Sequence, residues 1–512
     1  MIHRRPRLSR ELVVSLALDQ ASGLELPSEE TLGLPERIVQ FGTGAFLRGF
    51  IEYFVDEANR QGRFNGSIVA VSSTGSSRDA VLNEQDGLFT LAIEGVDAGA
   101  PRQRYRIVGS LSRALSARDE WDAVLDVARD PNIEIVISNT TEVGIVLDER
   151  DRADDAPPAS FPGKLARFLY ERARAFDYDT RRGVVVIPCE LIEDNGDKLC
   201  EIVHALAHAW RLGPRFARWL DEAVVFCNTL VDRIVPGAPT PDEAERLSAL
   251  FGYRDGLMTT CEPYALFAIQ GDDALRARLG FADADPRIIV APDIQPYRER
   301  KVRVLNGAHT ISVPAALLAG LETVRDAVTD ERVGRFIRRA MFDEIVPSLD
   351  VPDAEAFARE VLERFANPYI RHALIDITLY ATTKMKVRVV PSIVAYAERA
   401  GRAPSALAFG FAAYVAFMRG EVQTERRAAG LSVPDDPAGA RVRDAWHDID
   451  LHSDAAIAGL ARVICADREL WGTNLAAVPG FADAVADHLV RMRRHGIAAA
   501  LEHHLTEEPA NT

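Results

Sequence analysis

The ten residues Lys301 to Thr310, KVRVLNGAHT, contain three side chains that together could act on an alcohol or carbonyl carbon. Asn306 and His309 are three residues apart and share one face if the segment is helical. Lys301 lies five residues before Asn306 and is expected to reach in from the preceding turn or strand end. A lysine buried near other positive groups loses its proton readily and can serve as acid or base near neutral pH. The alternative is an amphipathic helix start with a solvated Lys301 and a turn at Asn306-Gly307.

A glycine turn between an apolar strand and a helical pattern lies closer to the N-terminus, in RIVQFGTGAFLRGF (37–50). Small residues at such a turn let the backbone approach a pyrophosphate, which a helix N-terminus attracts. Leu47 occupies the position of the third glycine, so the dinucleotide fingerprint is incomplete. A second buried strand, SIVAVS (67–72), follows and strengthens the interpretation. The residues expected to contact a cofactor here are Phe41, Gly42, Gly44, Ala45 and Phe46.

Composition predicts a soluble enzyme with two sizeable cores. The 512 residues are 47% hydrophobic and 27% charged, and the net charge is −16. An acidic surface argues against nucleic acid and anionic membranes as partners, and an anionic substrate would need a locally basic pocket. Five scattered cysteines without zinc-type spacing indicate a reduced, cytoplasmic protein, and no apolar run predicts a membrane span or a signal peptide.

Strand-like runs alternate with helical patterns up to about residue 290, and only helical periodicity follows Lys301. The alternation predicts a parallel sheet with helices on both faces. The expected strands are 38–41, 67–71, 133–138, 184–188, 224–228 and 288–291. The expected long helices are 327–345, 354–365, 405–419 and 456–466.

The fold class expected from this pattern is α/β. A Rossmann-type, doubly wound sheet domain that binds a dinucleotide should cover 30–290, and a helical, substrate-binding domain should cover 291–495. Residues 1–29 and 496–512 are expected to be terminal extensions. Lys301 then stands at the junction of the two domains, where ligand sites are frequent.

Several blocks in this order resemble the mannitol dehydrogenase family of polyol-specific long-chain dehydrogenases. The blocks are QFGTGAFLRGF (40–50), NEQDGLFTL (83–91), ISNTTEVGI (137–145), FCNTLVDRIVP (226–236) and KVRVLNGAH (301–309). The resemblance implies a dehydrogenase acting on CH–OH groups without a metal. It also implies that Lys301 is the general acid or base, that Asn306 donates to the developing oxyanion, and that His309 orients the substrate or the lysine.

Other strings resemble the branch of this family that interconverts keto-uronates and aldonates in hexuronate breakdown, a part of carbohydrate metabolism. They are DDAPPASFPGKLARFLYER (154–172), IPCELIEDNGDKL (187–199), IQPYRERKV (294–302) and NPYIRH (367–372). A sugar acid is therefore the expected small-molecule substrate, with fructuronate, mannitol or another polyol as alternatives. A nucleotide-binding protein without catalysis is the alternative from another class, against which the Lys301, Asn306 and His309 set argues.

The chain departs from the mannitol enzymes at three positions that the resemblance links to substrate. Leu191 stands in place of an asparagine, Arg298 in place of a frequent glutamate, and Asp376 in place of a substrate arginine. Asn195 is the candidate for the missing oxyanion donor, and its alternative is a turn residue. Asp232, next to Arg233, is either a substrate ligand or half of a buried pair.

The carboxylate of a sugar acid requires a cation, ideally an arginine fork. The candidates are Arg298, Arg371, His372, Lys384 and Arg388, and Lys384 matches a substrate-contacting lysine in the mannitol enzymes by resemblance. For the arginines, ordinary surface charge is the alternative.

The resemblance implies NAD as cofactor. The residues leave the choice open, because Arg78 could meet a 2′-phosphate and Asp79 a ribose hydroxyl. Asn139, Thr140 and Glu142 follow the strand at 133–138 and are expected beside the nicotinamide ribose, unless Asn139 merely caps the next helix.

Overall fold

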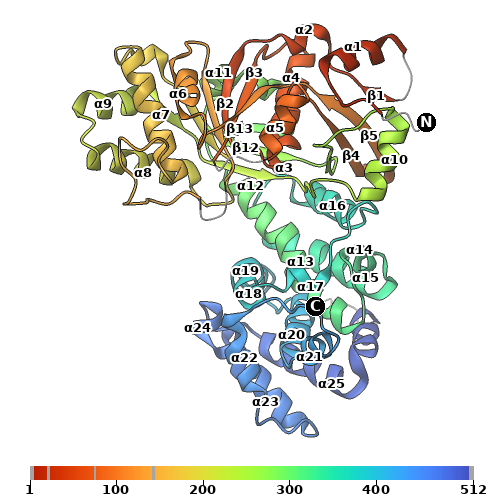
Figure 1. Ribbon diagram of the computed structural model, residues 1–512. Helices are drawn as coiled ribbons and strands as arrows, with labels where there is room; N and C mark the ends of the chain where they lie inside the picture. The colour runs from red at the N-terminus through yellow and green to blue at the C-terminus, as the bar shows by residue number, and fades with distance from the viewer. Residues whose placement is uncertain (1–4, 20–22, 74–76, 98, 141–143, 507–512) are drawn as a thin grey trace. The chain divides into compact units, whose positions relative to one another are not determined.

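The computed structural model describes residues 5–19, 23–73, 77–97, 99–140 and 144–506. The chain divides into two compact units (Figure 1). The first comprises Met1–Glu94 and Arg102–Ile294, and the second comprises Gly95–Pro101 and Gln295–Thr512.

A six-stranded, fully parallel sheet forms the centre of the first unit. Its order is β6-β3-β2-β7-β8-β9. This order reverses direction between β2 and β7, as in dinucleotide-binding doubly wound sheets, and it confirms the Rossmann-type fold predicted from the alternating pattern. The strands are β2 (Glu36–Phe41), β3 (Ser67–Ser72), β6 (Leu111–Ser116), β7 (Ile135–Ser138), β8 (Val185–Pro188) and β9 (Val225–Phe226).

Successive residues of β2 face opposite sides of this sheet and bury two separate cores. Ile38 belongs to one core with Phe54 of α4 (Ile51–Arg60) and with Phe50, the residue just before that helix. Val39 and Phe41 belong to the other core, beneath four helices. Those helices are α6 (Trp121–Arg129), α7 (Phe161–Ala175), α8 (Asn195–Ala209) and α9 (Pro214–Ala223). Apolar residues therefore occupy both faces of β2, which is why its sequence is mostly apolar from Ile38 to Phe41 and does not alternate with exposed residues.

The expected strand at 288–291 is present as β13 (Ile288–Ala291), but it belongs to a different sheet. It pairs in parallel with β12 (Leu266–Gln270), which pairs antiparallel with β10 (Thr229–Asp232). The expectation that 288–291 belongs to the parallel sheet is therefore wrong. A third sheet has the order β1-β5-β4-β11, with strands β1 (Leu24–Glu25), β4 (Phe89–Asp97), β5 (Ala100–Val108) and β11 (Thr259–Cys261).

The described N-terminal residues pack into the first unit. Leu8 and Val13 are buried in a small core with Leu247 and Tyr253. The shorter helices of this unit are α1 (Arg10–Asp19), α2 (Glu29–Leu32), α3 (Ala45–Arg48), α5 (Ser77–Glu84), α10 (Pro241–Phe251) and α11 (Asp273–Leu279).

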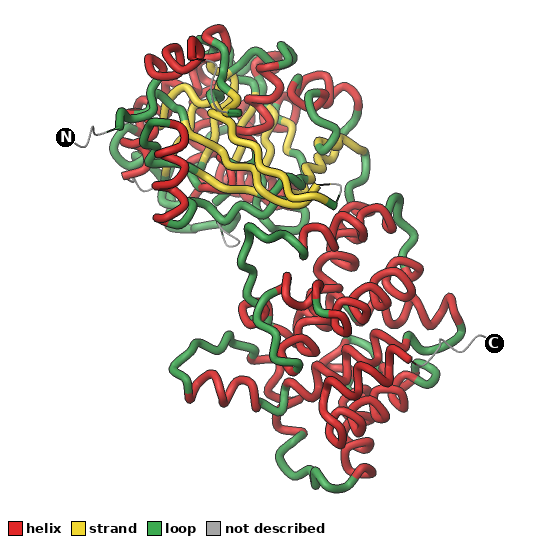
Figure 2. Tube along the Cα trace, turned by 90° about the vertical axis from the view of Figure 1, so that its right-hand side faces the viewer, coloured by secondary structure: helices red, strands yellow, loops and turns green. Residues whose placement is uncertain are grey.

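Residues 295–506 of the second unit form helices and loops (Figure 2). The expected helix 354–365 coincides with α16, whereas the one at 327–345 is divided because Asp330 ends one helix and caps the next. The α-helices are α12 (Gln295–Arg300), α13 (Gly307–Leu318), α14 (Val324–Thr329), α15 (Glu331–Arg339), α16 (Ala354–Phe365), α17 (Leu374–Ile377), α18 (Ala381–Arg388), α19 (Val390–Ala400), α20 (Ser405–Phe417), α21 (Glu421–Ala428), α22 (Ala440–Ala445), α23 (Asp454–Ala466), α24 (Arg468–Trp471) and α25 (Phe481–Thr506).

Helix α20 lies in the core of this unit and is held by a carboxylate from another element. Its N-terminus has no side-chain cap of its own, and the buried Glu344 accepts hydrogen bonds from the backbone N–H groups of Ala406 and Leu407, both at 2.7 Å. The last turns of α25 are also packed, because His504 is buried and its ring stacks on Phe409.

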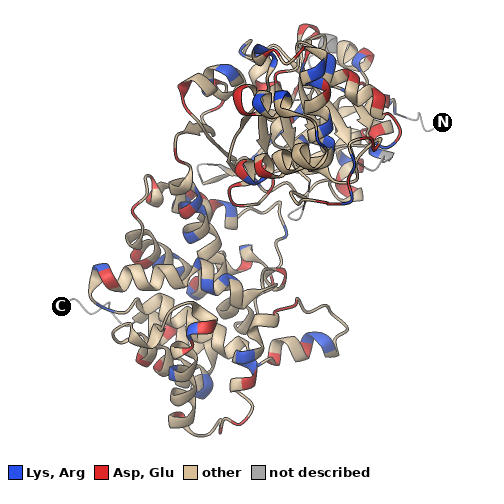
Figure 3. Cartoon of the chain, turned by 90° about the vertical axis from the view of Figure 1, so that its left-hand side faces the viewer, with Lys and Arg blue, Asp and Glu red and all other residues tan. Residues whose placement is uncertain are grey.

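Acidic and basic residues are interspersed along the chain in both units (Figure 3). Within the part of the chain that the structure describes, no helix is both long enough and apolar enough to cross a bilayer.

Candidate functional site

Lys301, Asn306 and His309 lie on one continuous helical run, so Lys301 does not reach in from a preceding turn or strand end as expected. The run consists of α12, a π-helical segment (Lys301–Asn306) and α13. In an α-helix, side chains five residues apart point in directions that differ by about 140°. This difference would separate Lys301 from Asn306. In the π-helical segment the N–H of Gly307 donates to the carbonyl of Val302, five residues earlier, so residues with this spacing come to one side.

Two buried arginines anchor the opposite side of this run. Arg303 donates from Nε to Ser392 Oγ at 2.7 Å and from Nη2 to Ser348 Oγ at 3.2 Å. Arg300 donates to the carbonyl of Pro352 and lies over the ring of Phe357. These contacts fix the rotation of the π-helical segment about its axis.

His309 is buried, and its ring is held between two others. It stacks on Phe365 with ring centroids 4.0 Å apart, and its edge meets His372 at 5.3 Å. Its Nε2 is buried without a hydrogen-bond partner among the described residues. Burial, and then His372, Arg364, Arg388 and Lys384, hold the pKa of His309 well below its usual range, so the imidazole is neutral.

Three of these neighbours of His309 are cationic, namely Arg364 of α16, and Arg388 and Lys384 of α18. The fourth is His372, whose own pKa is lowered by burial. Gly307 lets α18 approach, because a Cβ at this position would lie 3.1 Å from the carbonyl oxygen of Arg388. Burial lowers the pKa of the Arg388 guanidinium, and no carboxylate among the described residues pairs with it.

Other expected substrate residues fall into different surroundings. Arg298 is not a solvated surface arginine, because its Nε and Nη2 are buried without hydrogen-bond partners among the described residues. Arg371 is 80% exposed and faces Glu322 at 3.5 Å, so it lies outside the cationic group around His309. Lys384 donates to the carbonyl of Ile377 at 3.0 Å.

In the first unit, the glycine turn lies at the point where the sheet order reverses. Gly42 has φ +126°, and a Cβ there would lie 2.9 Å from the carbonyl oxygen of Asn139 and from Leu47 Cδ1. Leu47, which replaces the third glycine, thus fills the space beneath the turn. Gly44 has no atom near an added Cβ and precedes the four-residue helix α3, which contains Ala45 and Phe46.

Two side chains hold the carbonyl groups of this turn from within the unit. Gln40 donates to the carbonyl of Gly42 at 3.0 Å, and the buried Arg48 donates to that of Thr43 at 2.8 Å. The sequence pattern did not single out either residue, since Gln40 reads as part of the strand and Arg48 as part of a helix.

The loops after β7 and β8 are tied together beside this turn. Asn139 donates to the carbonyl of Cys189 at 2.7 Å, and Glu190 accepts from both the N–H and Oγ1 of Thr140. Asn139 does not cap the next described helix, α7, because Ser160 does so. Glu142 lies outside the described residues.

The residue that contacts the end of β3 is acidic and not basic. Asp79 is buried and accepts a hydrogen bond from Ser72 at the end of β3, whereas Arg78 is exposed. An acid in this position suits a ribose hydroxyl.

Asn195 does not fit the expected role of an oxyanion donor, because it is fully buried and its amide is used internally. Its Nδ2 donates to the carbonyls of Pro188 and Glu190 and to Thr229 Oγ1. Its Oδ1 accepts from the N–H of Thr229. Asn195 therefore joins β8, β10 and the start of α8.

The fourth sequence block also contributes internal contacts. Asp232 is buried at the end of β10. The neighbouring Arg233 donates to the carbonyls of Gly49 and Glu262 and lies over the ring of Tyr53. These contacts assign Arg233 to the packing of the first unit. Among the described residues, no group of three His, Cys, Asp or Glu side chains is placed to hold a metal ion.

A buried acid lies beneath the glycine turn. Glu52 is 1% exposed, accepts from Gln40 at 2.9 Å, and has no hydrogen-bond partner for Oε2 among the described residues. Burial raises the pKa of Glu52 to about 7, against the smaller opposing effects of Gln40 and Arg48.

The raised pKa of Glu52 predicts a pH-dependent loss of stability that Glu52→Gln should remove. Between a pKa of 4.5 in the unfolded chain and about 7 in the fold, the folded state binds the extra proton, so the free energy of unfolding falls as pH rises. Relative to the variant, the free energy of unfolding of the wild type should fall by at most about 3 kcal/mol across this pH window. Urea denaturation at pH 5 to 8 measures this difference, and parallel curves for the two proteins would contradict it.

Comparison with known proteins places both units in one family. Residues 36–281 match the mannitol dehydrogenase Rossmann domain, and residues 293–493 match the mannitol dehydrogenase C-terminal domain. The altronate oxidoreductase of Bacillus subtilis (strain 168) is 43% identical over 468 residues, covering 91% of this chain and 95% of that protein. The altronate oxidoreductase of Yersinia pestis is 40% identical, covering 91% and 96%.

Solved structures share the fold at lower identity. Mannitol 2-dehydrogenase of Pseudomonas fluorescens, in a ternary complex with NAD and D-mannitol, aligns with a TM-score of 0.68 at 24% identity, covering 98% of this chain and 100% of that one. A D-sorbitol dehydrogenase in substrate-free form aligns with a TM-score of 0.76 at 22% identity, covering 97% and 100%. The chain therefore belongs to the mannitol dehydrogenase family and is a dehydrogenase that acts on CH–OH groups.

Proposed function

We propose that this enzyme interconverts D-tagaturonate and D-altronate with NAD as cofactor, as a step of hexuronate breakdown in the cytoplasm. The relatives named altronate oxidoreductase support this substrate, since they match over 91% of the chain. The observation that carries the proposal is the cationic group around His309, in which Arg388 has no carboxylate partner among the described residues. A neutral polyol would gain little from such a group, whereas a uronate carboxylate would.

The residues at the switch point of the sheet fit a dinucleotide. The lack of a side chain at Gly42 lets the turn pack against Asn139 and Leu47, and the space beside Gly44 is open to a ligand because no atom lies within 4 Å of a Cβ built there. Asp79 supplies an acceptor for a ribose hydroxyl. The turn Gly42-Thr43-Gly44, together with Asn139 and Thr140, would hold the cofactor. When bound, NAD supplies or accepts the hydride.

The helical run of the second unit carries the proton chemistry in this proposal. Lys301 gives a proton to the keto oxygen during reduction and takes it back during oxidation. Asn306, on the same side of the π-helical segment, donates a hydrogen bond to the oxygen as negative charge develops on it. Neutral His309 uses its unpartnered Nε2 to orient a substrate hydroxyl. The mechanism needs no metal, because the lysine ammonium stabilises the oxyanion.

Substrate choice is tested by NADH oxidation with tagaturonate, fructuronate and fructose side by side, and again with NADPH. We expect turnover with tagaturonate and NADH to exceed the others. A preference for fructuronate would move the assignment to the sibling activity, for which the same cations would serve. A preference for fructose would contradict the role given to the cations.

Replacing Lys301 with methionine should separate chemistry from cofactor binding. We expect kcat to fall about 100- to 10,000-fold, which is the usual contribution of a positioned acid or base, while the affinity for NADH stays unchanged. Lys386→Met is the matched control, because Lys386 contacts the carbonyl of Glu469 instead. Equal activity of the two variants would exclude Lys301 as the proton donor.

Replacing Arg388 with glutamine should weaken the binding of the acid selectively. A charge-assisted hydrogen bond is worth about 1.5–3 kcal/mol, so KM for the keto acid should rise about 10- to 100-fold, with little change for fructose. Arg371→Gln is the control, because that arginine is largely exposed. A larger effect at Arg371 than at Arg388 would refute this assignment.

A further inference from the structure

A second pocket lies within the helical unit, at the end of α13 opposite to His309. Its volume is about 360 Å³, and Leu318, the last residue of α13, forms part of its wall. Nine residues separate His309 from Leu318, which corresponds to about 14 Å along the helix axis. The pocket is therefore distinct from the group of side chains around His309.

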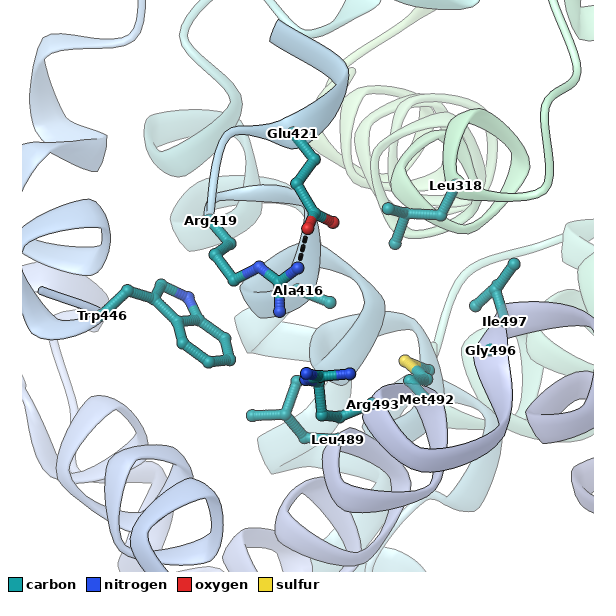
Figure 4. Close-up of a pocket in the computed structure, with 10 residues that line it drawn as sticks. All are labelled: Leu318, Ala416, Arg419, Glu421, Trp446, Leu489, Met492, Arg493, Gly496 and Ile497. Atoms are coloured by element: carbon teal, nitrogen blue, oxygen red, sulfur yellow. Dashed lines mark ion pairs between the residues drawn. The ribbon is translucent and has the colours of Figure 1, made fainter. Parts of the chain in front are cut away.

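One side of the pocket carries more positive than negative charge. Arg419 and Arg493 both face it, and the only carboxylate among its lining residues is Glu421, which pairs with Arg419 (Figure 4). Glu421 is 61% exposed, so it can swing away into solvent. Arg493 has no ion pair among the described residues, and its Nε is buried without a hydrogen-bond partner there.

The remaining wall of the pocket is apolar. Leu489 and Met492 of α25 are buried next to Arg493. The indole of Trp446 is held by its hydrogen bond from Nε1 to the carbonyl of Val415 at 2.9 Å, and it lies beneath the guanidinium of Arg419. The wall thus offers a flat aromatic face and flexible apolar groups beside two guanidinium groups.

A break in α25 shapes the far end of the pocket. Gly496 has φ 78° and ψ 166° inside this helix, and no atom lies within 4 Å of a Cβ built there. The break turns the following residue, Ile497, onto the pocket wall. The pocket is thus a structured concavity of the size that small ligands occupy.

We propose that this pocket binds a small organic anion, with a carboxylate or phosphate head between Arg419 and Arg493 and an apolar or aromatic body against Trp446, Leu489 and Met492. Guanidinium groups bind such heads through paired hydrogen bonds. A dinucleotide exceeds the available volume. The proposal does not depend on the substrate assigned to the enzyme.

The test uses phenyl phosphate and benzoate as probes in calorimetric titrations of the full-length enzyme, with inorganic phosphate and benzyl alcohol as comparisons. We expect at least one aromatic anion to bind with a dissociation constant of about 1 mM or tighter. Arg493→Gln should weaken binding about tenfold or more. The adjacent Arg494→Gln should not, because Arg494 pairs with Asp454 outside the pocket. Arg388→Gln should also leave binding unchanged, which separates this pocket from the group around His309.

Glu421→Gln is a second test, which removes no arginine from the pocket and so does not depend on whether the fold tolerates that loss. Removing the competing carboxylate should tighten binding of the same probe several-fold. The proposal is overturned if neither aromatic anion binds, if Arg493→Gln and Arg494→Gln behave alike, or if Glu421→Gln leaves the affinity unchanged. It is also overturned if inorganic phosphate binds as tightly as phenyl phosphate, because the apolar wall would then contribute nothing.

Discussion

The chemistry that we propose for the second unit depends on the hydrogen bond between the N–H of Gly307 and the carbonyl of Val302, which makes one turn of a long helix π-helical. Without this wider turn, Lys301 and Asn306 would point in different directions, because their spacing suits no face of an α-helix. The turn is held in place by Arg303, whose hydrogen bonds to Ser348 and Ser392 lie on the other side of the helix. Single π turns of this kind are frequent at functional sites.

Charge is distributed unevenly in a chain whose net charge is −16. Three cationic side chains and His372 surround the imidazole of His309, and burial together with these neighbours keeps it neutral. A neutral imidazole with a free nitrogen can exchange hydrogen bonds with hydroxyl groups in either direction. Arg388 adds positive charge to this region, because no carboxylate among the described residues pairs with it. The resulting site suits a ligand with hydroxyl groups near one end and an acid at the other.

The sequence predicted the parts of the fold in which local pattern and tertiary environment agree. Apolar runs such as 67–71 marked buried parallel strands, and α16 was predicted to the residue because its apolar periodicity is unbroken. β6 was missed because Ser112 and Arg113 interrupt its apolar face to bind Glu36. The π-helical turn left no signal in the sequence that was recognised. Arg364 and Phe365 also escaped notice, since their proximity to His309 results from how α16 packs on α13.

The structure narrows the set of groups that can orient a substrate oxygen. Leu191, at the position where an asparagine was expected by resemblance, is 62% exposed and apolar, and Asn195 has committed its amide to β8 and β10. Of Leu191, Asn195 and Asn306, only Asn306 has a side-chain amide that is not used in such internal hydrogen bonds. A site with one amide donor fixes the reacting oxygen less tightly than a site with two, so binding energy must come from another part of the substrate. In the proposed function, the carboxylate of a sugar acid would provide that second point of attachment at Arg388, which a neutral polyol lacks.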